Sequence, residues 1–418
     1  MSEPLAQRPA TRVLALVVVS FGLGYFLSYF LRNVNAVLSP LIVAEFNLTA
    51  TELGLLTSLY FFAAAAVLVP VAILLDRFGP RRVLIGQMIV TAIGCALFAT
   101  GSTADDLMIG RTLIGLGVAG GLTTAFKAVT VWFPRERWAT GNSLVLGVGS
   151  LGVIAGTQPL QFMLGVLDWR QIFWLVVAVC LALAVLLLLK VPDRNAPRTP
   201  GQPIAAIYRE VLALPVFWRL MPVASLPMAV FFSIQGLWAN GWMSDVAGLT
   251  QNEIGARLLL MALAMSCGML INGSISDLLT GLGIPLAAVL SVGIVGLLSA
   301  QLILVLQLAP QAYWPWAVMG FTGNIGALGY PLLSRRFPAS VSARAMSVLA
   351  MSNFGLAFAV QFSTGALLDL FGTDAAGHYP VRAYEIAFSF FLILQMAAFV
   401  WFLTARAVWT NPVAPRSP

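Results

Sequence analysis

The stretch Leu74–Leu84, LLDRFGPRRVL, interrupts a chain whose side chains are otherwise mostly apolar. It holds an aspartate, three arginines, a glycine and a proline, whereas charged residues make up only 9% of the 418 residues and hydrophobic residues 60%. Long apolar runs lie on both sides of it. A short charged segment between two such runs is typical of a loop that joins two membrane-spanning helices.

Apolar runs of this kind recur along the whole chain, whose mean hydropathy is +0.92. About 20 apolar residues in a helix cross a hydrocarbon core of about 30 Å. We predict twelve spans, at 13–42, 53–75, 82–101, 106–132, 139–166, 170–190, 217–243, 254–279, 284–307, 312–334, 342–370 and 382–408. The expected fold class is therefore an all-α integral membrane protein.

The net charge of +7 reports membrane topology. With the N-terminus placed in the cytoplasm, all but six of the 23 Lys and Arg residues fall in cytoplasmic segments. Arg170, Arg257 and Arg382 lie on the opposite side, and Arg32, Arg111 and Lys127 lie within spans. This asymmetry follows the positive-inside rule and predicts that both termini are cytoplasmic. We expect a multi-pass protein of the plasma membrane, or of the inner membrane if the source is bacterial, and no nucleic-acid partner.

Two halves of the chain echo each other at an offset of about 200 residues. Asp76 matches Asp277, Phe133-Pro134 matches Phe337-Pro338, and Asp168 matches Asp369. The polar interval between the sixth and seventh spans separates the halves. We therefore predict an N-terminal six-helix bundle at 1–190, a cytoplasmic linker at 191–216 and a C-terminal six-helix bundle at 217–418. Such a duplicated layout is typical of transporters.

The charged loop resembles the signature loop of the major facilitator superfamily, which runs glycine, three residues, Asp, Arg, an aromatic residue, Gly and then basic residues. The residues that match this pattern are Asp76, Arg77, Phe78, Gly79 and the pair Arg81-Arg82. Ala72 stands where the family usually has glycine, and Pro80 where it often has a basic residue. The resemblance covers nearly the whole chain and implies twelve helices in two pseudo-symmetric bundles that expose a central site alternately. A basic loop that only anchors topology is the alternative for this segment.

The same resemblance implies a gating role for several residues. Asp76, Arg77, Gly79, Arg81 and Arg82 would latch the two halves together on the cytoplasmic side, with Gly79 in a tight turn. Arg111, which precedes Gly115 and Gly117 in the fourth span, would support the first helix. In the fifth span, Gly147, Gly152 and Gly156 predict close packing against a neighbouring helix.

Charges within the spans are all cationic, and charges in the bilayer core usually mark function. Arg32 lies in a Tyr29-x-x-Arg32-x-x-Asn35 pattern that resembles the first helix of organic-anion transporters of the superfamily. Helical spacing places Ser28, Arg32 and Asn35 on one face. The resemblance implies that Arg32 binds a carboxylate or phosphate, which its guanidinium matches geometrically. Lys127 is a second candidate, although it lies near enough to a helix end to snorkel to the interface.

Uncharged polar side chains supply the remaining candidates for substrate binding. Each could instead bond between helices. They are Gln158 in the fifth span, Gln235 and Trp238 in the seventh, Asn324 in the tenth and Asn353 in the eleventh. None of the 16 Asp and Glu residues lies deep in a span, so the sequence leaves the coupling ion open.

The function predicted from these patterns is secondary active transport of a small, anionic, carboxylate-like metabolite by alternating access. Two alternatives stay open: export of a neutral or hydrophobic compound, and a non-transporting membrane receptor. We expect no enzyme activity, because the spans hold no nucleophile, metal cluster or paired carboxylates. We also expect no cofactor and no metal, with the lipid bilayer and a small-molecule substrate as the partners of a monomer.

Overall fold

The computed structural model describes residues 11–194, 209, 211–334, 339–375 and 377–404, and these form helices and loops without a strand. Most of the predicted linker 191–216 lies outside the described residues. The first group of helices comprises α1 (Thr11–Asn33), α2 (Asn35–Phe46), α3 (Ala50–Thr100), α4 (Ala104–Val118), α5 (Gly121–Trp132), the short helix η1 (Arg135–Arg137), α6 (Trp138–Ala155), α7 (Gln158–Met163) and α8 (Trp169–Lys190).

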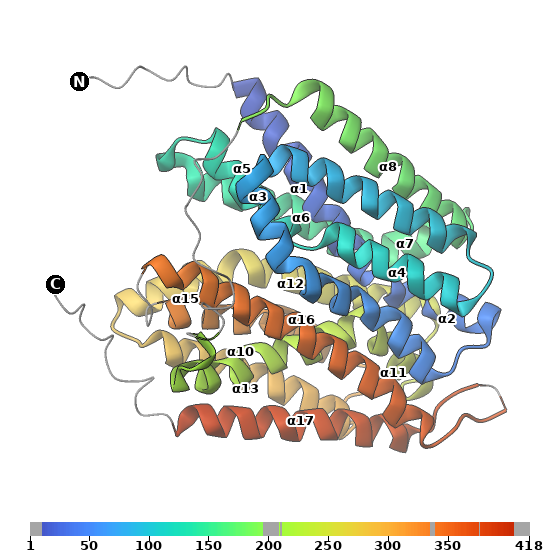
Figure 1. Cartoon of the computed structure of the whole chain (residues 1–418). Helices are drawn as coiled ribbons and strands as arrows, with labels where there is room; N and C mark the ends of the chain where they lie inside the picture. The colour runs from blue at the N-terminus through green and yellow to red at the C-terminus, as the bar shows by residue number, and fades with distance from the viewer. Residues whose placement is uncertain (1–10, 195–208, 210, 335–338, 376, 405–418) are drawn as a thin grey trace, which may run out of the picture.

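A second group follows the linker. It comprises α10 (Pro215–Ser233), the π-helix η2 (Ile234–Trp238), α11 (Ala239–Asp245), α12 (Gln251–Gly281), α13 (Leu286–Val305), α14 (Trp314–Thr322), the 3-10 helix η3 (Ile325–Leu328), α15 (Gly329–Ser334), α16 (Ala339–Asp369) and α17 (Val381–Leu403). The two groups lie side by side, and α1 begins at the same end of the molecule at which α17 ends (Figure 1).

Twelve membrane crossings follow from these elements. Ten helices of the described chain are long and apolar enough to span a bilayer. One of them, α3, has 51 residues and contains two crossings, because the backbone breaks at Gly79 with φ 77° and ψ 164°. Glycine adopts such a positive φ without steric cost, and this is the tight turn that the charged loop predicts. The twelfth crossing is the interrupted run α14–η3–α15.

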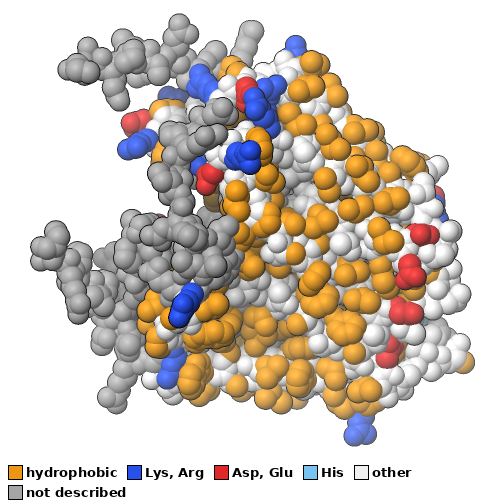
Figure 2. Space-filling view, in the orientation of Figure 1, with side chains coloured by type: hydrophobic (Ala, Val, Ile, Leu, Met, Phe, Trp, Pro, Cys, Tyr) orange, Lys and Arg blue, Asp and Glu red, His pale blue; other side chains and the backbone are white. Residues whose placement is uncertain are grey.

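Hydrophobic side chains cover the flank of the molecule between its two ends (Figure 2). Lys and Arg side chains gather toward the end that holds the described termini, hereafter the terminal end, and acidic side chains follow the opposite edge (Figure 2). Only helices satisfy every backbone group inside a bilayer, so an apolar flank over helices fits a membrane protein. The opposite edge is hereafter called the far end.

Glycines bring α6 close to α1. A Cβ atom at Gly152 would come within 2.9 Å of the Phe26 carbonyl carbon, and one at Gly156 would lie 3.4 Å from the Phe30 carbonyl oxygen. The prediction for Gly147 is wrong, since no atom lies within 4 Å of the corresponding position. At about 100° per residue, Gly147 is about 180° around the helix from Gly156.

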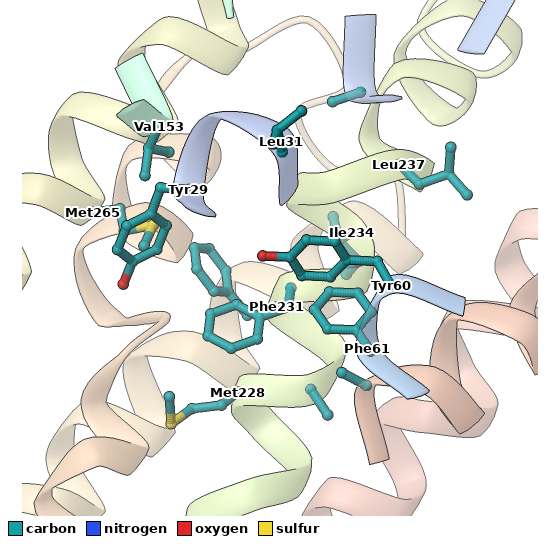
Figure 3. Packing of buried hydrophobic residues seen from close by; sticks show 14 of the residues in the cluster. Tyr29, Leu31, Tyr60, Phe61, Val153, Met228, Phe231, Ile234, Leu237 and Met265 are labelled. Carbon is teal, nitrogen blue, oxygen red and sulfur yellow. The ribbon is translucent and has the colours of Figure 1, made fainter. Parts of the chain in front are cut away.

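The two groups of helices meet in a seam that is closed at the far end. α3 and α16 run along each other there, with Phe61 against Phe354 at 6.2 Å and Gly54 against the Gln361 backbone. Figure 3 shows Tyr60 and Phe61 of α3 beside Phe231 and Ile234 of the second group. This buried apolar seam separates the far end from the space described next.

Candidate functional site

A cavity of about 450 Å³ lies between the two groups, on the terminal-end side of the closed seam. Aromatic side chains from both groups line it, together with amides and a single charged side chain, that of Arg32, in the described part of the chain. The lining residues used below are Tyr25, Ser28, Tyr29, Arg32, Tyr60, Phe126, Phe232, Asn272, Asn324, Tyr330, Asn353 and Phe354.

Arg32 is held at this cavity between two aromatic rings. Its guanidinium carbon lies 4.3 Å from the centre of the Tyr29 ring and 4.2 Å from that of Phe232. Only 8% of the residue is exposed, and its Nη2 atom has no hydrogen-bond partner. Aromatic faces attract a guanidinium but leave its N–H edge free. A buried donor without a partner costs about 1–3 kcal/mol. A ligand that supplies a hydrogen-bond acceptor to Arg32 would remove this cost.

The local shape of the first span explains how Arg32 is positioned. Only Val34 separates α1 from α2, and it keeps helical dihedral angles. Arg111 of α4 donates through Nη1 to the Leu31 carbonyl oxygen at 2.7 Å. Its own guanidinium lies 5.0 Å from the Tyr60 ring. Arg111 therefore contacts the backbone next to Arg32 and is itself 1% exposed.

Two amides of the second group face the same cavity. Asn324 has an unpartnered Nδ2 and Asn353 an unpartnered Oδ1. Asn353 donates to Tyr330 Oη at 3.3 Å. Polar atoms without partners in an enclosed space are uncommon, and a bound ligand is one way to satisfy them. The cavity thus offers one cationic donor from the first group and a neutral donor and acceptor from the second.

Other predicted binding residues lie elsewhere. Lys127 is not among the lining residues: its Nζ bonds Asp76 Oδ1 at 2.8 Å. Helical geometry separates it from the cavity, because the neighbouring Phe126 takes the lining position. The Lys127 charge is therefore already paired with the aspartate of the charged loop.

Four more candidates lie in the closed seam toward the far end. Asn35 and Gln235 are buried, and neither amide has a hydrogen-bond partner. Trp238 donates to the Gln361 carbonyl oxygen at 3.2 Å, and Gln158 lies against Gly255. Asn35 is not among the residues that line the cavity. Val34, which lies between it and Arg32, keeps helical dihedral angles (φ −52°, ψ −35°).

The charged loop forms contacts within the first group. Arg81 donates to the Leu187 and Leu188 carbonyl oxygens at 3.0 and 2.7 Å, and Arg82 pairs with Asp193. Arg77 lies over the Phe78 ring at 5.1 Å. These contacts tie the turn of α3 to the end of α8. The predicted latch toward the second group stays a prediction, because none of these contacts of the described residues reaches the second group.

Sequence reasoning missed the aromatic lining. Tyr25 and Tyr29 precede Arg32 at helical spacing, and this signal was available in the sequence. Tyr60, Phe232 and Tyr330 come from three other spans, and nothing in their local sequence distinguishes them from the many aromatic residues that pack in the core.

A sequence profile of the Major Facilitator Superfamily matches residues 21–360. The chain belongs to the Major Facilitator Superfamily. The fold agrees: a bacterial homolog of the human lysosomal transporter Spinster, solved in an inward-facing and unoccupied conformation, superposes with a TM-score of 0.77 at 19% identity, over 97% of this chain and 100% of that one.

Curated relatives of this superfamily member differ in what they are named for. The probable sulfoacetate transporter SauU of Cupriavidus necator is 26% identical over 312 residues, 70% of this chain and 72% of SauU. The chloramphenicol resistance protein of Streptomyces lividans is 27% identical over 268 residues, 63% of this chain and 66% of that protein. The uncharacterized transporter YybO of Bacillus subtilis is 35% identical over 147 residues, so the match spans about a third of either chain (35% and 34%).

Proposed function

We propose that this protein is a secondary active transporter of a small organic anion, without enzyme activity, and that Arg32 binds the anionic group. The observation that carries the proposal is the unpartnered Nη2 of a buried arginine at a cavity with no acidic lining residue in the described chain. Hydrogen bonds between a guanidinium and a carboxylate are among the strongest in proteins. One relative, SauU, is named for an organic anion.

The aromatic lining indicates the rest of the substrate. Tyr25, Tyr60 and Phe354 surround the space beside Arg32 and favour an apolar body. Asn324 and Asn353 supply a hydrogen-bonding pole on the opposite group of helices. Because Arg32 is the single charged side chain in the described lining, we expect a monocarboxylate to bind more tightly than a dicarboxylate of the same size.

Alternating access follows from the seam. The two six-helix halves would rock about it, and the cavity then opens in turn to either side. We place the terminal end in the cytoplasm on the distribution of Lys and Arg. Under this proposal, the closed far end makes this structure an inward-facing state. Under this proposal the charged loop of Asp76, Arg77, Gly79, Arg81 and Arg82 closes the cytoplasmic side in the other state.

A binding screen on the purified protein tests the substrate class. Carboxylates, phosphates and neutral metabolites are compared by the thermal stability that they add, since a ligand of the folded state raises it. We expect stabilisation by a monocarboxylate and its loss in Arg32→Ala. Losing one charge-assisted hydrogen bond, about 1.5–3 kcal/mol, weakens affinity about 10- to 150-fold.

Arg257 offers a matched control. It is 4% exposed, bonds the Glu253 and Gln311 carbonyl oxygens, and lies 4.1 Å from the Tyr313 ring, but it is outside the cavity. Arg257→Ala should lower stability and keep the stabilisation by anions. If anions stabilise the Arg32→Ala protein as they do the parent, the anion assignment is wrong.

Export of a neutral, hydrophobic compound is the second candidate. The aromatic lining favours it, and one relative is named as a chloramphenicol resistance protein. Under this alternative a neutral aromatic compound stabilises the parent and Arg32→Ala equally, because only stacking contacts contribute.

A further inference from the structure

Asp369 connects the two groups of helices at the far end. It ends α16, and its carboxylate accepts from the backbone of α3: Oδ1 from the Ala50 N–H at 3.0 Å and Oδ2 from the Thr51 N–H at 2.7 Å. Tyr379 also donates its hydroxyl to Oδ1. The first N–H groups of a helix lack partners within the helix, and the helix dipole favours a negative charge there. One carboxylate therefore holds the start of α3 against the end of α16.

The equivalent residues of the other half of the chain do not form this contact. Thr49–Glu52 at the start of α3 and Thr250–Glu253 at the start of α12 lie 201 residues apart, and each forms a capping box. Asp168 and Asp369 lie 201 residues apart as well. Yet Asp168 accepts from the Trp169 N–H of its own following helix at 2.8 Å. Of the two equivalent carboxylates, Asp369 therefore bonds across the seam, whereas Asp168 bonds to the helix that follows it.

The seam has a second cross-link of a different kind. Pro40 has no N–H, so the carbonyl oxygen of Ala36, four residues earlier, receives no helical bond. Asn240 of α11 donates its Nδ2 to this oxygen at 2.8 Å. This bond involves neutral groups that do not titrate. Asp369 is the cross-link whose strength depends on its charge.

We propose that Asp369 is the outer latch of this transporter, and that a proton taken up by its carboxylate from the outer side releases the latch. This inference rests on the proposed alternating access and on the terminal end being cytoplasmic. A protonated carboxyl group loses the charge that the helix N-terminus favours and accepts hydrogen bonds more weakly. Protonation therefore favours the outward-open state and couples the transport cycle to the outer pH.

Other titratable side chains lie near Asp369 at the far end. From α3, Glu52 bonds back to the Thr49 N–H at 2.9 Å, and from the loop before α17 comes Tyr379. One bond further lies Asp245 of α11, which accepts from the Tyr379 N–H, from Tyr384 and from His378. Protonation of His378 strengthens its bond to Asp245, but both residues belong to the second group, so this bond does not cross the seam.

A reporter cysteine at position 361 tests the latch without any substrate. Gln361 is 1% exposed, and its side-chain oxygen has no partner in the seam. Gln361→Cys is built on Cys267→Ser, because Cys267 is the exposed cysteine and Cys95 and Cys180 are buried. The labelling rate of the purified protein by a water-soluble thiol reagent then measures how often the far end opens.

The comparison is the ratio of labelling rates with and without Asp369→Asn, taken at the same pH so that thiol reactivity cancels. At about pH 7.5 we expect a ratio of about ten, the factor that corresponds to one charge-assisted hydrogen bond. Because the closed state binds the carboxylate, its proton is taken up only below the usual range of an aspartate, about pH 4. We therefore expect the ratio to begin to fall near pH 4 and to approach one only on further acidification, when the parent latch is protonated too.

Asp168→Asn is the matched control, as the equivalent carboxylate that does not cross the seam, and should leave the labelling rate unchanged at every pH. Asp245→Asn and His378→Gln should keep the pH dependence of the ratio. If Asp369→Asn does not fold, Tyr379→Phe removes a donor to Asp369 together with an acceptor of the Ala50 N–H, and should raise labelling in the same direction.

A ratio of one near neutral pH overturns the latch, and a ratio that does not change on acidification overturns its release by protons. The result is independent of Arg32: loss of the anion assignment leaves the labelling ratios intact, and unchanged labelling leaves anion binding intact.

Discussion

Gly152 of α6 couples the packing of the bundle to the geometry of the site. A methyl group at this position would come within 2.9 Å of the Phe26 carbonyl carbon, 3.0 Å of the Phe26 Cα and nearer still to the carbonyl oxygen. These are backbone atoms of α1, which cannot rotate away. α1 also carries Tyr29 and Arg32, so Gly152→Ala must push the first span and its cavity-lining residues away from α6.

Gly147 on the same helix provides the control, because nothing lies within 4 Å of its Cβ position. Alanine in a helix is more favourable than glycine by about 0.5–1 kcal/mol, so Gly147→Ala should stabilise by about that amount. Gly152→Ala gains the same term but adds overpacking, which typically costs about 1–3 kcal/mol. We therefore expect Gly152→Ala to be less stable than Gly147→Ala by about 1–3 kcal/mol.

Both variants are compared by their half-life of inactivation at a fixed temperature, since membrane proteins often unfold irreversibly. Binding of the stabilising anion is measured alongside. Gly152→Ala should inactivate faster and bind the anion more weakly. Equal half-lives and equal affinities for the two variants would refute the reasoning, because they would mean that α1 is not held by contact with α6.

Three further outcomes follow from the contacts described. Lys127→Met should leave anion affinity unchanged and cost at most about 1 kcal/mol of stability, because its exposed ion pair with Asp76 lies outside the cavity; a loss of affinity like that of Arg32→Ala would return Lys127 to the site. Arg111→Met should destabilise by about 1–3 kcal/mol, because the buried Leu31 carbonyl oxygen loses its donor, and thermal inactivation measures this. The hydrogen bond to Asp245 raises the pKa of His378. The stability that this pair adds is therefore complete below about pH 6.5, the usual pKa of histidine, and is lost as the pH rises through the raised pKa. The difference in melting temperature between the parent and His378→Gln should accordingly shrink above about pH 6.5.

The sequence by itself determined the class of the protein and much of its plan. Twelve apolar runs require helices in a bilayer, because no other open structure satisfies backbone hydrogen bonds there. The glycine of the charged loop forms a tight turn with positive φ, and the profile of the superfamily confirms the predicted family. The sequence also singled out Arg32, because a charge within an apolar span is costly and therefore informative.

The tertiary structure decided which polar residues share a space. Asn35 has the right helical spacing from Arg32 but is buried outside the cavity without a hydrogen-bond partner. Lys127 lies next to a lining residue yet pairs with Asp76. Neither outcome is local, because the packing of neighbouring helices decides which side chains border the cavity and which partner a cation meets. The same holds for Asp168 and Asp369, whose equivalent positions in the repeat give no sign of which one reaches across the seam.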